Sequence, residues 1–86
     1  MTLKELRKLP VGTKLLLVQR LTGEVNKIRT VYEITNDEIA FEREEDGMLS
    51  YMAFPKPPPL VFVEEPEGFS IKDEHGSVTL RYRVIE

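Results

Sequence analysis

The segment from Arg29 to Arg43 alternates apolar and charged side chains on either side of a short polar stretch. Successive side chains of a β-strand point to opposite faces, so this alternation is typical of two half-buried strands. Thr35, Asn36 and Asp37 lie between them, and Asn and Asp favour turns because their side chains bond to nearby backbone groups. The segment therefore predicts an antiparallel hairpin.

The same alternation predicts which side chains of the hairpin are buried. The apolar residues of its first strand share one face, which we expect to be the inner one: Ile28, Tyr32 and Ile34. Arg29 and Glu33 fall on the opposite face, and we expect both to be exposed. On the second strand Ile39 and Phe41 share the inner face.

Strand-like segments continue through residues 14–85, and turn signals separate them at intervals of about 8–12 residues. The expected strands are 14–21, 28–34, 38–44, 48–54, 60–63, 69–72 and 77–85. Asp46-Gly47 is a strong hairpin signal, and the proline-rich stretch 55–59 interrupts the sheet. Residues 1–86 therefore predict a single all-β domain, a small antiparallel meander that closes into a bent barrel or roll.

A short helix is expected before the first strand, over residues 2–9. Thr2 and Glu5 have the spacing of a capping box, and Pro10 ends the helix. Two turns are not stable alone, so the leucines of this segment must pack on the sheet. We expect the helix to cover an open end of the sheet.

Composition excludes several classes of protein. The chain is 41% hydrophobic and 31% charged, which is too apolar for an intrinsically disordered protein. It has no cysteine, so disulfides, thiolate metal sites and cysteine nucleophiles are excluded. No secretory signal pattern and no membrane-spanning apolar run occur, so we expect a cytoplasmic protein.

Charge is distributed unevenly along the chain. Residues 1–30 carry seven basic and two acidic side chains, whereas residues 31–75 carry three basic and twelve acidic ones. Such a division produces either a molecule with one basic and one acidic side or a fold in which the two segments pair internally. The sequence leaves both outcomes open.

No residue pattern indicates catalysis or a cofactor. The one histidine, His75, lies in an expected turn beside Gly76 without a nucleophile nearby in the sequence. No phosphate-binding, dinucleotide-binding or hydrolase motif is present, and no calcium-binding loop. We therefore expect a protein that is not an enzyme and that has no metal site and no cofactor.

Binding to another protein is the leading functional hypothesis. Residues 50–59 combine two aromatic rings, a methionine and a stiff proline run, which are favourable at protein interfaces. The candidate contact residues are Tyr51, Phe54, Pro55, Pro57 and Pro58. Tyr51 and Phe54 point to opposite faces of a strand, so at least one of them should be core. Self-association is left open.

A basic strand face that contacts nucleic acid is the alternative. Its candidate residues are Lys27, Arg29, Arg81 and Arg83, which share one face only if their strands are neighbours. Tyr32 and Tyr82 are expected to face inwards, so the exposed aromatics of a single-strand binder are missing. The pI of about 5.2 also argues against nucleic acid.

The stretch Leu9-Pro10-Val11-Gly12-Thr13-Lys14-Leu15 is similar to the start of many SH3-like barrels, with a glycine turn before an apolar first strand. The resemblance covers seven residues and implies no functional residue. The size of the chain is that of small adaptors or inhibitors encoded by bacteria and their mobile elements, which is the class we expect.

Overall fold

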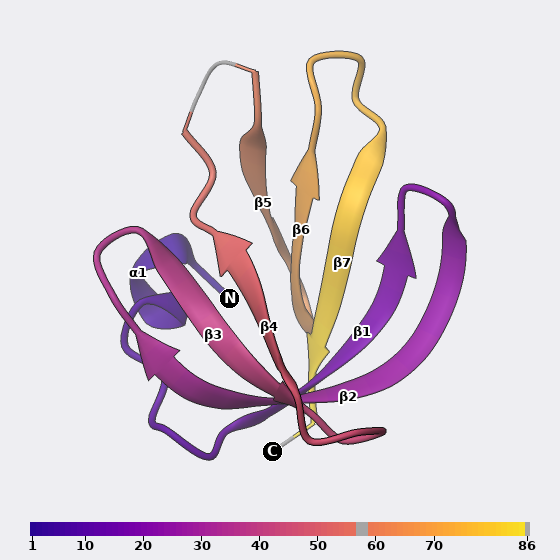
Figure 1. The fold of residues 1–86 in the computed structure, drawn as a ribbon. Coiled ribbons are helices and arrows are strands. Elements are labelled where there is room, and N and C mark those ends of the chain that lie inside the picture. The colour runs from indigo at the N-terminus through magenta and orange to yellow at the C-terminus, as the bar shows by residue number, and fades with distance from the viewer. Residues whose placement is uncertain (57–58, 86) are drawn as a thin grey trace.

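The computed structural model describes residues 1–56 and 59–85 and confirms the expected fold class (Figure 1). Within these residues, seven antiparallel strands form one curled sheet, a half-barrel, in the order β4-β3-β2-β1-β7-β6-β5. The strands are β1 (Lys14–Arg20), β2 (Gly23–Ile34), β3 (Glu38–Arg43), β4 (Leu49–Ala53), β5 (Val61–Glu65), β6 (Gly68–Lys72) and β7 (Val78–Val84). One short helix, α1 (Leu3–Leu6), precedes them. No helix of the described residues is long and apolar enough to cross a membrane.

The central strand of the sheet is β1, which pairs with β2 on one side and with β7 on the other. The remaining strands follow as hairpins in both directions, so β4 and β5 are the two edges. β4 and β5 follow each other in the chain, yet they lie at opposite edges of the sheet, and within the described residues no ladder joins them (Figure 1). The sheet is therefore curled without being closed.

Two β-bulges lie in the central part of the sheet. The pairing register shifts between Leu17 and Gln19 on β1, and between Val31 and Glu33 on β2. A bulge places one extra residue on one strand, which bends that strand and increases its twist. Val18 is the extra residue relative to β7, and Tyr32 is the extra residue relative to β3. The bends bring β3 towards β7 across the interior.

A row of four aromatic rings fills this interior. The ring centroids of Phe41 and Tyr82 are 5.4 Å apart, those of Tyr82 and Phe69 are 5.3 Å apart, and those of Phe69 and Phe62 are 5.2 Å apart. The row connects β3 to β5 by way of β7 and β6. Burial raises the pKa of Tyr82 to about 12, because the phenolate would lose its hydration there.

The N-terminal segment covers one end of the half-barrel. Leu6 is fully buried in the core, and the capping box of Thr2 and Glu5 is present. The helix is shorter than the expected span of residues 2–9, because only Leu3–Leu6 is α-helical and a turn follows. This agrees with the expectation that the helix packs on the sheet.

Polar contacts hold this segment at both of its ends. The amino group of Met1 donates to the carbonyls of Glu65 and Gly68, at 3.2 and 3.1 Å. Arg7 donates to the carbonyl of Asn36, at 3.0 Å. The segment thus extends from the β5–β6 turn to the β2–β3 turn, across the opening of the sheet.

The expected faces of β2 are wrong before and at its bulge, where Ile28, Arg29 and Tyr32 lie on the faces opposite to those expected, and correct after it for Glu33 and Ile34. Arg29 is 2% exposed and faces inwards, whereas Tyr32 is 53% exposed. Up to Val31 the inward residues are odd-numbered, and after the extra residue Tyr32 the phase shifts so that Ile34 pairs with Ile39 on the inner face. A strict period of two cannot predict such a shift.

Gly68 lies where no side chain fits, and this predicts a loss of stability in Gly68→Ala. A Cβ atom at Gly68 would lie 2.0 Å from the carbonyl oxygen of Tyr82 and 2.9 Å from the Cα of Arg83. Both are backbone atoms of β7, so relief requires β6 to move. We expect a loss of about 2–3 kcal/mol in urea unfolding, at the upper end for overpacked sites, because the clash is with backbone atoms.

Gly76→Ala is the matched control, because its Cβ would meet nothing within 4 Å and only its φ of 79° disfavours a side chain. This control should lose about 1 kcal/mol. Equal losses in the two variants would contradict the steric account of Gly68.

Candidate functional site

The outer face of β4 carries three exposed apolar side chains: Leu49, Tyr51 and Ala53. Tyr51 is 61% exposed and Leu49 is 37% exposed. Tyr51 pairs with Ala40 on β3, and Ala40 pairs with Glu33 on β2, so these three residues form one row across the sheet. Exposed Tyr32, beside Glu33 at the bulge, extends the aromatic surface. This combination is unusual for a solvated sheet face.

The same strand also has a free backbone edge. At the ends of the β3–β4 ladder, Arg43 N–H donates to the Met48 carbonyl at 2.8 Å and Phe54 N–H donates to the Asp37 carbonyl at 2.9 Å. Bonded and non-bonded pairs alternate along an antiparallel ladder. These two end bonds show that the inward residues of β4 are the ones whose backbone groups bond to β3. The N–H and C=O groups of the outward residues therefore point away from β3.

The N–H and C=O groups of the three outward residues, Leu49, Tyr51 and Ala53, point to this edge. Within residues 1–56 and 59–85, no group is hydrogen-bonded to them. Unpaired groups on an edge strand are a template for another strand. We call the outer side chains and the backbone edge of β4 together the β4 edge site.

The two edges of the sheet differ in protection. Edge strands of soluble proteins commonly carry charged side chains, prolines or bulges that prevent pairing. On β5, Glu64 lies opposite the buried Phe69 and so carries a charge on the inner face. No charged residue, proline or register shift occurs within β4. The β4 edge is thus the unprotected one.

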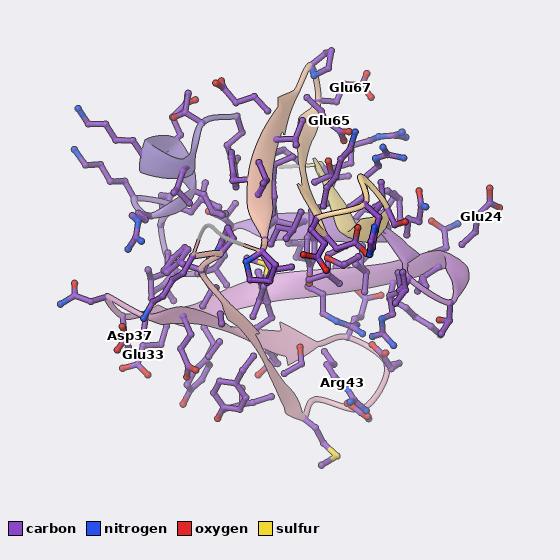
Figure 2. All side chains as sticks on the ribbon, turned by 90° about the horizontal axis from the view of Figure 1, so that it is seen from above. Glu24, Glu33, Asp37, Arg43, Glu65 and Glu67 are labelled. Carbon is purple, nitrogen blue, oxygen red and sulfur yellow. The ribbon has the colours of Figure 1, made fainter. Side chains whose placement is uncertain are left out.

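Carboxylates surround the β4 edge site. On β3, Glu38 lies opposite Ala53 and Glu42 lies opposite Leu49. Glu33 and Asp37 lie close together at the end of the β2–β3 hairpin, on the side of the molecule away from Glu24 (Figure 2). In the part of the chain that the structure describes, none of the carboxylates Glu33, Asp37, Glu38 and Glu42 forms an ion pair.

Of the residues expected to bind a protein, the structure exposes some and buries others. Tyr51 is exposed at the β4 edge site, whereas Phe54 is 3% exposed and Pro55 is buried. The guanidinium of Arg7 lies 4.1 Å above the Phe54 ring and helps to cover it. Phe54 and Pro55 are therefore core residues in this fold and are removed from the candidate surface. Pro57 and Pro58 lie outside the described residues.

The four residues of the alternative basic face are not brought together. β2 and β7 flank β1 on opposite sides, and Arg29 faces inwards while Arg81 and Arg83 face outwards. The condition that their strands are neighbours is therefore not met. Lys27 is exposed at a separate position on β2.

Each of these arginines also has a carboxylate partner. Arg81 Nε lies 3.0 Å from Glu65, and Arg83 Nε lies 3.2 Å from Glu67. Arg29 Nη1 lies 2.8 Å from Glu45. These pairs join the basic ends of the chain to its acidic middle, so a part of the charge asymmetry is paired internally.

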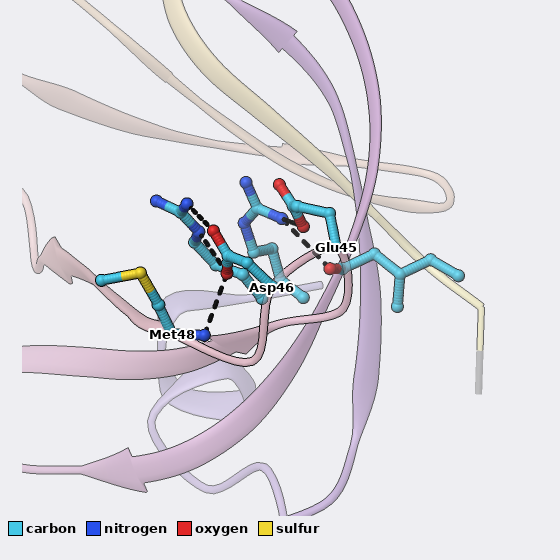
Figure 3. Close-up of polar contacts among 6 residues, drawn as sticks. Glu45, Asp46 and Met48 are labelled. Atoms are coloured by element: carbon cyan, nitrogen blue, oxygen red, sulfur yellow. Dashed lines mark hydrogen bonds and ion pairs between the residues drawn. The ribbon is translucent and has the colours of Figure 1, made fainter.

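The β3–β4 loop is fixed by two arginine–carboxylate pairs (Figure 3). Arg29 donates to Glu45, and Arg43 donates to both oxygens of Asp46. The hydrogen bond from the Arg43 side chain and then that from the Met48 N–H hold the pKa of Asp46 below its ordinary value. The backbone N–H of Glu45 itself, followed by Arg29, lowers the pKa of Glu45. The loop that begins β4 is thus anchored to the buried Arg29.

His75 lies in an exposed turn, as expected. Asp73 accepts hydrogen bonds from the N–H groups of His75 and Ser77 at 2.9 Å, which fixes the turn. The imidazole is 79% exposed and lies 3.6 Å from Glu74. Within the described residues, no group of three or more histidine, aspartate or glutamate side chains is arranged to hold a metal ion.

No protein-family model, no curated protein and no solved structure matches this chain. The similarity to SH3-like barrels therefore remains limited to the seven residues of the first turn and strand.

Phe54 and Tyr51 are expected to respond oppositely to truncation. Phe54→Ala should cost about 3–5 kcal/mol of unfolding free energy, because it leaves a cavity in the core. Tyr51→Ala should cost less than about 1 kcal/mol, because the ring is exposed. Urea unfolding of both variants measures the difference, and a larger loss in Tyr51→Ala would contradict the assigned positions.

Glu45→Gln should destabilise the protein, because the buried Arg29 would keep its charge without a carboxylate partner. Glu44→Gln is the matched control, since Glu44 is exposed and forms no ion pair among the described residues. The melting temperature of Glu45→Gln should be the lower of the two at pH 7.

The pH dependence follows from the lowered pKa of Glu45. A carboxylate whose pKa is lower in the folded state stabilises the fold above its unfolded value, near 4.5, and this contribution is lost as the pH falls through the folded value. The advantage of the wild type over Glu45→Gln should therefore shrink below about pH 4.5. An advantage that is constant between pH 7 and pH 3 would contradict the ion-pair account.

Proposed function

We propose that this chain is a small, non-catalytic β module that binds another protein through the β4 edge site. The observation that carries the proposal is the absence of any charge, proline or bulge within an edge strand whose outer side chains are apolar and exposed. Such an edge promotes aggregation of a soluble protein unless a partner covers it. The presence of such an edge in a chain that is 31% charged supports a binding role.

The chemistry of the site supports a protein partner. An extended segment that joins a sheet edge gains backbone hydrogen bonds, and its side chains alternately contact the two faces of the sheet. Tyrosine is enriched among the residues that contribute most to protein interfaces, because it buries a large ring with little loss of conformational entropy. Tyr51 lies at the middle of β4, and Tyr32 lies on the same outer surface two strands away.

The proposal predicts a position-specific cross-link to a second protein. Benzoylphenylalanine in place of Tyr51 should capture a different protein in extracts of the source cells, whereas the same probe in place of the exposed His75 should not. With the captured protein purified, Tyr51→Ala should weaken binding by about 30-fold, which corresponds to a central interface residue. His75→Ala should leave the affinity unchanged.

Binding that is indifferent to Tyr51→Ala would overturn the proposal, provided that the variant is folded. Its circular dichroism and melting temperature serve as that control. A cross-link from both positions would indicate non-specific association and would count against the site.

A further inference from the structure

We propose that the partner of the β4 edge site is an extended segment that alternates apolar and basic side chains. This inference rests on the function proposed above and specifies the chemistry of the partner. The free backbone groups of Leu49, Tyr51 and Ala53 require a partner in β conformation, because only an extended chain matches their spacing along the edge.

Geometry assigns the two faces of the added strand to different side chains. The new strand would lie about 4.8 Å beyond β4, with its side chains alternately on the inner and outer faces of the sheet. Inward side chains would continue the inner face beyond Met52, which is buried and belongs to the core. Apolar residues suit these positions, because a charge there would lie beside the core without a partner.

The outward side chains would lie beside the apolar row of β4 and about 10 Å from the carboxylates of β3, which is two strand spacings. Lysine and arginine can cover this distance, because their long aliphatic stems pack on apolar surface while the charged end reaches further. The shortest route from the added strand to a carboxylate of β3 passes over Ala53, because its side chain is small and lies opposite Glu38. A basic residue of the partner beside Ala53 is therefore placed to approach Glu38.

Charge complementarity favours this partner over a second copy of the chain. Among residues 47–55 there is no basic side chain, so a second β4 would bring nothing to pair with Glu38 or Glu42. Face-to-face association of two copies would place the same carboxylates against each other. An acidic segment would be repelled for the same reason.

The test uses two short acetylated and amidated peptides, one that alternates lysine and valine and one with glutamate in place of every lysine. Each is titrated into the ¹⁵N-labelled full chain, and amide shifts are followed by NMR. The lysine peptide should shift the amides of Leu49, Tyr51 and Ala53 and weaken by about fivefold as salt rises from about 0.05 M to about 0.5 M. The glutamate peptide should leave these amides unshifted.

Two pairs of variants separate the backbone and charge contributions. Tyr51→Pro and Tyr51→Ala both lack the ring, but only the proline removes the N–H at the free edge, so Tyr51→Pro should bind the lysine peptide about 2- to 10-fold more weakly. Glu38→Gln should weaken binding about two- to fivefold, whereas Glu24→Gln, on the far side of the molecule, should not. Circular dichroism and melting temperatures control for folding.

Each other outcome overturns the inference in a distinct way. Equal shifts with both peptides would remove the basic requirement. Shifts spread over the acidic β5–β6 turn at Glu65 and Glu67 would indicate non-specific attraction. Concentration-dependent light scattering that Tyr51→Pro abolishes would identify a second copy as the occupant. A Tyr51-dependent cross-link together with failed peptides would leave the proposed function standing, whereas failure of both would remove the function as well.

Discussion

The contact between Phe41 and Tyr82 determines how the rest of this structure is arranged. The two rings come from β3 and β7, which are separated in the sheet by β2 and β1, and yet their centroids are 5.4 Å apart. A flat sheet would hold these strands about 14 Å apart. Only a strongly curled sheet permits the contact, and the bulges of β1 and β2 lie in the two strands that must bend.

The curl also explains why the sheet ends in two unlike edges. The aromatic row continues from Tyr82 through Phe69 to Phe62, so it reaches β5 but ends at β3 on the other side. Beyond β3 the inner face depends on the smaller Met52 of β4, and α1 fills the opening through Leu6. β4 is therefore held by its ladder with β3 and by the loop anchored on Arg29, and among the placed residues no strand pairs with its other side.

The sequence predicts the number of strands and their succession along the chain well, because each connection carries or adjoins a glycine or proline or, between β2 and β3, contains Asn36-Asp37. Seven antiparallel strands and an N-terminal capping box could be read from it. The faces of β2 could not, since the bulge at Tyr32 depends on pairing with β3 and shifts the period within a single strand. The burial of Arg29 is not predictable from its own strand either, because its partner Glu45 lies in the β3–β4 loop.

The candidate site was only partly predictable. Tyr51 stands out by its aromatic and apolar surroundings, but Phe54, three residues later, continues the β3–β4 ladder on the inner face with Met52 and is core. A stronger indication of the site is the lack of charge between Asp46 and Lys56, in a chain that is 31% charged. That run, directly before a proline-rich break in the sheet, indicates an edge strand that lacks the usual protection.

The small size of β4 limits how tightly any strand can bind to it by backbone contacts alone. Three outward residues offer six backbone groups, and hydrogen bonds contribute about 0.5–1.5 kcal/mol each. Association costs about 4–15 kcal/mol in lost freedom of motion, which is as large as the whole contribution of the edge. Side chains must therefore supply the remainder. Tyr51 and the carboxylates Glu33, Glu38 and Glu42, which form no ion pair within residues 1–56 and 59–85, are the groups placed to do so. The side-chain pattern of the partner therefore decides whether it binds.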